Sequence, residues 1–227
     1  GGVSGEDNLL LMNNPTLPGD VWLVAHVGEE GLGDLQGMRV VVDRFGHIPL
    51  AYIVLEGMAL GQVYHRALGV QRYRIQFHTP GGHSWVDYGI PSAIHQLADL
   101  INKLGKIPLP TNPRTTINVG IIGGGTSINT IAAEAFLELD LRSESETVLK
   151  NLIRQVDNLV KVANKRNIEV TSEKIGNRPA GSIKTNHPLI QLVISTLHSL
   201  GVQPTLSVGS TDANIPLSLV CQQSAWA

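Results

Sequence analysis

The sequence has a single cysteine, Cys221, among its 227 residues. One thiol excludes an intramolecular disulfide and a zinc site built from several cysteines. Lysine and arginine total 17 against 19 acidic residues, and no basic block stands out, which argues against a nucleic-acid-binding surface. No apolar run approaches the roughly 20 residues of a membrane-spanning helix. We therefore expect neither nucleic acid nor a membrane among its partners.

The chain also lacks a signal-peptide pattern at its start, an internal repeat and a low-complexity segment. We accordingly expect the cytoplasm as its compartment. It opens on "GGVSGEDN", without a methionine, and closes on "SLVCQQSAWA", which has no periodic pattern. We interpret the chain as truncated at both ends. Its 42% hydrophobic and 16% charged residues are typical of a soluble globular enzyme or binding protein.

Two apolar runs in the first part of the chain end in acidic residues. "DVWLVAHV" (20–27) and "IPLAYIVLEG" (48–57) favour strands that are buried on both faces of a parallel sheet. Glu29 and Glu30 follow the first run, and Glu56 lies at the end of the second. Because open α/β sheets bind ligands beyond the carboxyl ends of their strands, we expect the three carboxylates at one sheet edge. Adjacent carboxylates repel, so a cation or separate tasks must distinguish Glu29 from Glu30.

From about residue 71 the pattern changes to alternating strands and amphipathic helices. The predicted order is strand, helix, strand, strand, helix, strand, which is the ferredoxin-like arrangement. Ser143 and Glu146 form the expected capping box of the second helix. A further helix and a turn-rich segment follow this module. The predicted elements lie at residues 71–79, 90–105, 115–124, 134–143, 143–167 and 168–176, with the later helix at 187–201 and the turns at 207–218.

This order predicts an α/β protein in which a module of roughly a hundred residues is inserted into another domain. We place the first part of a catalytic domain at residues 1–70 and its second part at 178–227. The inserted lid or dimerisation domain is expected at residues 71–177.

Seven motifs occur along the chain in a fixed order: "VGEEGLGDL", "YIVLEG", "TPGGHSW", "PSAIHQLADLI", "GGGTSINTIAAEAFLELDLRS", "GNRPAG" and "GSTDANIPLS". In these motifs the chain resembles the M20 family of zinc metallopeptidases, which includes peptidase T, carboxypeptidase G, succinyl-diaminopimelate desuccinylase and aminoacylase-1. The resemblance extends to about residue 219. It implies an incomplete zinc-exopeptidase-like catalytic domain with an inserted ferredoxin-like βαββαβ lid.

The resemblance implies two zinc ions, bridged by an aspartate and a water molecule. Paired metal ions lower the pKa of bound water and polarise the scissile carbonyl. By position, Glu29 is the general base and Glu30 is a metal ligand, which would separate the tasks of the two neighbours. Glu56 matches a ligand of the second ion, with Asp43 as the competing candidate. Asp7 resembles the bridging aspartate.

The same resemblance assigns residues to the oxyanion and to the substrate. His83 resembles the lid histidine that, in dimeric members, reaches the active site of the partner subunit and stabilises the oxyanion. Asn129 and Arg178 match residues that bind carbonyl or carboxylate groups of the substrate. The alternatives are turn chemistry for Asn129 and a solvated surface cation for Arg178. The "GSTDAN" segment is expected to line the site, with Asp212 supporting the residues that do so, and a homodimer formed through the lid is implied.

The chain departs from the family in its histidines. None of the eight histidines has an aspartate two positions later, and no histidine follows the "TDAN" segment. Each zinc ion would keep only carboxylates, although zinc favours nitrogen ligands. We therefore expect a hydrolase that cleaves an amide bond of a small peptide or an N-acyl amino acid, impaired in zinc binding and activity. The alternative is a catalytically inactive dimerisation or binding module derived from that family.

Overall fold

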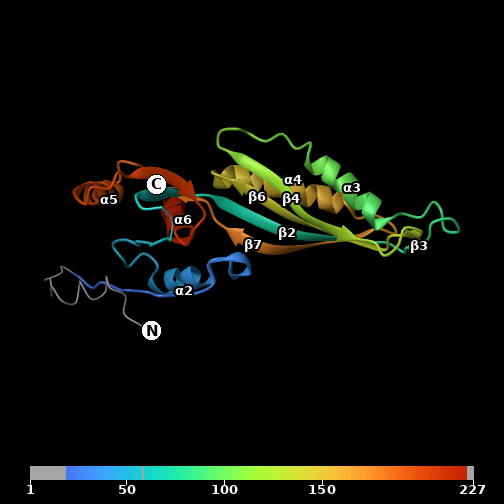
Figure 1. Cartoon of the computed structure of the whole chain (residues 1–227), viewed down its shortest axis with the longest axis horizontal. Coiled ribbons are helices and arrows are strands. Elements are labelled where there is room, and N and C mark those ends of the chain that lie inside the picture. The colour runs from blue at the N-terminus through green and yellow to red at the C-terminus, as the bar shows by residue number, and fades with distance from the viewer. Residues whose placement is uncertain (1–18, 58, 224–227) are drawn as a thin grey trace.

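The structure, a computed structural model, describes residues 19–57 and 59–223 of the chain. Its elements form an elongated molecule with a large four-stranded sheet at one end and a small three-stranded sheet at the other (Figure 1). We call residues 69–178 the four-stranded unit and the described remainder the three-stranded unit. No helix in the described ranges is long and apolar enough to cross a membrane.

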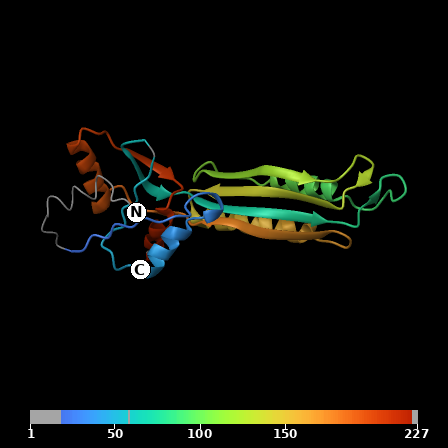
Figure 2. The ribbon, with the colours of Figure 1, turned by 60° about the horizontal axis from the view of Figure 1, so that its bottom comes forward.

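The four-stranded unit has the ferredoxin-like order that the sequence predicts. Its principal elements are β2 (Gly69–His78), α3 (Ala93–Leu104), β4 (Thr115–Gly124), β6 (Glu134–Ser143), α4 (Glu146–Ala163) and β7 (Glu169–Arg178). The sheet order is β4-β6-β2-β7, and every neighbouring pair is antiparallel. Helices α3 and α4 cover one face of the sheet, and the other face is open (Figure 2). Two short strands, β3 (Gly82–His83) and β5 (Thr130–Ile131), pair separately at the far end.

Alternation along β2 and β6 explains the core between this sheet and its helices. Tyr73, Ile75 and Phe77 of β2 are at most 1% exposed. Leu139 and Leu137 of β6 lie opposite Tyr73 and Ile75 and are equally buried. Burial of each such side chain contributes about 1.5–3 kcal/mol. The intervening residues are polar, so one face of each strand meets the helices and the other meets solvent.

The start of α4 corrects the predicted capping box. The N-cap is Ser145, whose hydroxyl accepts a hydrogen bond from the Val148 amide at 3.5 Å. Ser143 is fully buried and belongs to β6. The Glu146 carboxylate accepts a hydrogen bond from the Ala180 amide at 3.0 Å. The acid therefore joins the start of α4 to the segment after β7 instead of closing a capping box.

Replacement of Ser145 by alanine should lower the free energy of unfolding by about 1 kcal/mol, because an amide of the first helical turn loses its acceptor. Urea unfolding followed by circular dichroism measures this change. Ser172→Ala, on an exposed position of β7, is the control and should stay within about 0.5 kcal/mol of the parent. Equal losses for the two variants would contradict the N-cap assignment.

The three-stranded unit is smaller and has little core. It contains η1 (Gly31–Gly33), α2 (Gln36–Phe45), β1 (Gln62–Ala67), β8 (Gly181–Ser182), α5 (Pro188–Ser199), β9 (Thr205–Gly209) and α6 (Asn214–Gln223). β1 lies between β8 and β9, antiparallel to the first and parallel to the second. Leu35, Met38 and Val42 pack with Ile215. Helix α6 occupies a region where turns and a tail without a pattern were predicted.

The apolar runs at 20–27 and 48–57 differ from the prediction of buried strands. The structure assigns no strand to either run. Trp22 is 64% exposed, Val27 is 87% exposed and Leu50 is fully exposed. A strand that is buried on both faces needs neighbouring strands and covering helices. In the described residues the three-stranded sheet consists of β8, β1 and β9, and neither run is a strand of it. The α/β class is confirmed, but among the described strands only β1 and β9 pair in parallel.

Candidate active site

Glu29 lies where the two units meet, and Arg178 holds it there. Arg178 is the last residue of β7 and is only 6% exposed. Its Nη1 donates to Glu29 Oε1 at 3.0 Å, and its Nη2 donates to the Glu29 carbonyl oxygen at 2.7 Å. Nη1 also lies 3.4 Å from the carbonyl oxygen and from the hydroxyl of Ser210. The guanidinium thus joins the end of β7 to the loop before η1 and to the segment after β9.

The neighbouring carboxylates Glu29 and Glu30 are in unlike surroundings. Burial raises the pKa of Glu29, the positive charge of Arg178 opposes this rise, and the negative charge of Glu30 adds to it. Glu30 is the N-cap of η1 and has extended backbone angles. Of the two acids, Glu29 is therefore the one whose carboxylate is fixed by a cation of the chain itself.

The third predicted acid, Glu56, interacts electrostatically with Glu30. Partial desolvation raises the pKa of Glu56 most, and the negative charges of Asp212 and Glu30 raise it further. Hydrogen bonds from the Asp212 amide and the Thr211 hydroxyl act in the opposite direction. Glu30 therefore interacts electrostatically with both Glu29 and Glu56, and Asp212 interacts with Glu56; we call Glu29, Glu30 and Glu56 the acidic cluster.

His26 belongs to the same place and was missed in the sequence. Its Nε2 lies 3.0 Å from Asp212 Oδ2. Burial raises the pKa of Asp212, and the charges of His26 and Arg178 oppose that rise. A Cβ on Gly37 would lie 2.4 Å from His26 Nδ1, so α2 packs directly against the ring. The available signal was a lone titratable side chain in an otherwise apolar run.

The acidic cluster can be tested against the expected zinc ions. Burial together with like charge raises the pKa of Glu56, which a bound cation would reverse. In the described ranges, Asp212 Oδ1 and His26 Nδ1 are buried without a hydrogen-bond partner. However, no group of three or more histidine, cysteine, aspartate or glutamate side chains there is arranged to hold a metal ion. Asp7 lies outside the described residues. The described residues therefore do not fit a complete two-zinc site.

His83 and Asn129 lie together at the other end of the molecule. His83 pairs with Thr130 across β3 and β5, and the Ser84 amide donates to the Asn129 carbonyl oxygen at 3.0 Å. Figure 1 shows β3 at the end of the four-stranded unit that is farthest from α2. The predicted site residues therefore fall into two groups: Glu29, Glu30, Glu56 and Arg178 at the junction of the units, and His83 with Asn129 at the far end.

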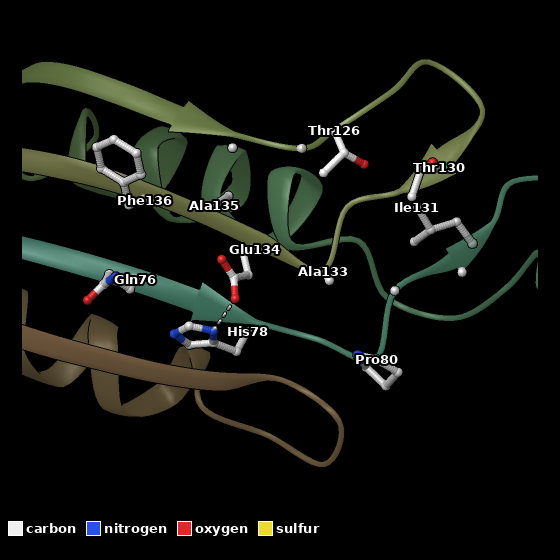
Figure 3. Close-up of a pocket in the computed structure, with 14 residues that line it drawn as sticks. Gln76, His78, Pro80, Thr126, Thr130, Ile131, Ala133, Glu134, Ala135 and Phe136 are labelled. Atoms are coloured by element: carbon white, nitrogen blue, oxygen red, sulfur yellow. Dashed lines mark ion pairs between the residues drawn. The ribbon is translucent and has the colours of Figure 1, made fainter.

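A pocket of about 420 Å³ also lies near the far end, but none of the predicted site residues lines it. It is formed by the ends of β2 and β6 and by β5 (Figure 3). His78 Nδ1 and Glu134 Oε1 form an ion pair across it at 3.7 Å. A Cβ on Gly124 would lie 2.6 Å from Ala135 Cα, so this glycine is required by packing within the chain. We do not place the active site in this pocket.

Comparison with protein families decides the lineage of the four-stranded unit. The family model of the M20 peptidase dimerisation domain matches residues 67–168. Residues 67–168 belong to the family of M20 peptidase dimerisation domains. The match covers most of the four-stranded unit and identifies it as a dimerisation domain of this kind.

The fold of the chain is similar to those of three solved structures, among others. Aminopeptidase PepT from Bacillus cereus has a TM-score of 0.67 and 19% identity, over 82% of this chain and 50% of its own. A tripeptidase from Staphylococcus aureus has a TM-score of 0.66 and 19% identity, over 85% and 51%. The aminobenzoyl-glutamate utilization protein from Klebsiella pneumoniae has a TM-score of 0.61 and 20% identity, over 75% and 46%. The chain thus spans about half the length of these proteins. A search of curated proteins finds no match.

Proposed function

We propose that this chain is part of a hydrolase that cleaves an amide bond in a small peptide or an N-acyl amino acid. The observation that supports this function is the meeting of Glu29, Glu30 and Glu56 beside Arg178, next to an M20 dimerisation domain. Two of the similar structures are named as an aminopeptidase and a tripeptidase, which makes a peptide the first substrate to test.

In this proposal Glu29 is the general base that accepts a proton from the attacking water. The contacts with Arg178 fix its carboxylate relative to the end of β7. Two zinc ions are the proposed cofactor, and when bound they would activate that water. Glu30, Glu56 and Asp7 are the proposed ligands. Because the described residues do not complete this ligand set, we assign no step to the metal.

We also propose a homodimer that forms through the dimerisation domain. β4 is an edge strand, and none of its ten residues is charged. Ile121 is 50% exposed and Ile122 is 59% exposed on this strand. The opposite edge strand, β7, carries charged residues such as Glu173 and Lys174. Since natural edge strands avoid pairing by carrying charge, β4 is the edge suited to pair with a second copy.

In the proposed dimer, residues at the far end of one copy could act at the active site of the other copy. His83 and Asn129 lie away from Glu29 within one chain (Figure 1). In the proposal they act on the substrate that is bound at the acidic cluster of the second copy. His83 would stabilise the oxyanion, and Asn129 would bind a carbonyl group of the substrate.

The alternative is a catalytically inactive dimerisation or binding module of the same family. In the described residues, no group of three or more potential ligand side chains is placed to hold a metal ion, which favours this alternative. The dimerisation domain would not need such a group in order to fold or to pair. In that case the acidic cluster would serve only to join the two units.

Zinc titration combined with a substrate panel separates the two functions. If the chain is an impaired hydrolase, isothermal calorimetry detects weakly bound zinc, and the zinc-loaded protein cleaves dipeptides, tripeptides or N-acetyl amino acids at a low rate. The same samples are examined by light scattering for their oligomeric state. A stable dimer that binds no zinc and cleaves none of these compounds would support the inactive module.

A further inference from the structure

The guanidinium of Arg178 is already engaged by groups of its own chain. Two of its nitrogen atoms donate to Glu29, one to the carboxylate and one to the main-chain carbonyl oxygen. The third nitrogen, Nε, lies 3.8 Å from Asp34 Oδ1. The side chain of Arg178 is 7% exposed. A carboxylate of a substrate would have to displace Glu29 or Asp34 to bind this fork.

A second set of contacts fixes the same loop to the same strand. Asp34 Oδ2 accepts a hydrogen bond from the Asn177 amide at 2.8 Å. Arg39 Nε donates to the Asp34 carbonyl oxygen at 3.2 Å. Asp34 has a φ of 48°, a left-handed conformation that is uncommon for residues other than glycine. The residue keeps this conformation because contacts on both sides, from β7 and from α2, hold it.

We propose that Arg178 is a positioning residue, which orients the Glu29 carboxylate for proton transfer and does not bind the carboxylate of the substrate. This inference rests on the proposed function of Glu29. The physical reason is that one rigid guanidinium donates to both the carboxylate and the main-chain carbonyl oxygen of Glu29. These two contacts together restrict rotation of the Glu29 side chain. A lysine ammonium is a point donor on a flexible stem and cannot reproduce both contacts.

Arg178 is buried, and the side chain of its partner Glu29 is 24% exposed. A buried arginine without its partner leaves an uncompensated charge, which makes removal of either partner costly. Arg178 further contacts Ser210 at 3.4 Å, so the position of Glu29 depends on three segments of the chain. A residue that binds substrate needs donors that are accessible to it. Two nitrogens of Arg178 donate to Glu29, and its Nε is buried without a hydrogen-bond partner, 3.8 Å from Asp34 Oδ1.

A comparison of Arg178→Lys with the parent on two matched substrates tests the role. One substrate is a dipeptide with a free terminal carboxylate, and the other is the same dipeptide with a terminal amide. We expect kcat to fall about tenfold or more on both substrates, with KM nearly unchanged, because the base is misplaced. A rise in KM confined to the carboxylate substrate would overturn the proposal, since it would show that Arg178 binds that group.

Arg74→Lys is the matched control for this experiment. Arg74 Nη1 also donates to a carboxylate, that of Glu138, at 2.8 Å, but on the open face of the sheet. Its kcat and KM should equal those of the parent on both substrates. A loss in the control equal to that of Arg178→Lys would also overturn the proposal, because the effect would then follow from any weakened ion pair.

A stability cycle tests the contact independently of turnover. Arg178→Ala should lower the melting temperature by roughly 6–12 °C in the parent and by clearly less in a Glu29→Gln background, because the lost partner is then already neutral. Equal losses in the two backgrounds would overturn the proposal. If the parent cleaves no substrate, the proposed function fails, and this cycle alone decides whether Arg178 holds Glu29.

Discussion

Replacement of Glu29 by glutamine should reduce kcat for peptide hydrolysis by about 10²- to 10⁴-fold, because the amide cannot accept a proton from water. Glutamine has nearly the same size as glutamate, and its carbonyl oxygen can still accept the hydrogen bond from Arg178 Nη1. The fold and the zinc affinity should therefore be retained. Steady-state kinetics and calorimetry on the same preparation measure the two quantities.

Asp43→Asn is the matched control for this experiment. Asp43 is an exposed acid on α2 and the competing candidate of the sequence analysis. Its neutralisation should leave both kcat and zinc binding at the parental values. If Glu29→Gln hydrolyses peptides at the parental rate, Glu29 is not the base and the proposed mechanism is wrong.

The substitution Ile121→Lys should convert the proposed dimer into monomers. Ile121 is half exposed on the edge strand β4. Because a twofold interface uses the same patch of both copies, the dimer would contain two added positive charges. Loss of apolar contact and like-charge repulsion together should raise the dimer dissociation constant about 100-fold or more. Sedimentation over a range of protein concentrations measures this shift, and circular dichroism verifies the fold.

Thr171→Lys provides the control on the opposite edge of the sheet. Thr171 is exposed on β7, so the added charge is the same but lies away from β4. This variant should associate like the parent. An unchanged dissociation constant for Ile121→Lys would show that the copies do not pair through β4.

The four-stranded unit could be predicted almost completely from the sequence. Its strands alternate and its helices are amphipathic, and each of these patterns is local, so it can be read without knowledge of neighbours. The predicted strands at 115–124 and 134–143 coincide with β4 and β6. The N-cap of α4 was misplaced by two residues because Ser143 and Ser145 both precede the helix, and only packing shows that Ser143 is committed to the sheet.

The three-stranded unit could not be predicted in the same way. An apolar run such as 20–27 shows that a segment is suited to burial, but it does not show whether partner strands are present to bury it. The motif around Arg178 identified a cation near the site, and its contact with Glu29 became visible only in three dimensions. His26 was missed because an apolar run gives a single polar residue no periodic signal.

The pairing of Val70 with Arg178 has a consequence for the way in which the four-stranded unit is joined to the rest of the chain. It places the first and last residues of the four-stranded unit side by side. The whole unit could therefore be inserted into one surface loop of another protein without displacing the ends of that loop. Transfer of the unit into another protein would require only two backbone ends that lie close together. The few residues at this junction, Arg178 among them, would then have to match both the unit and its recipient.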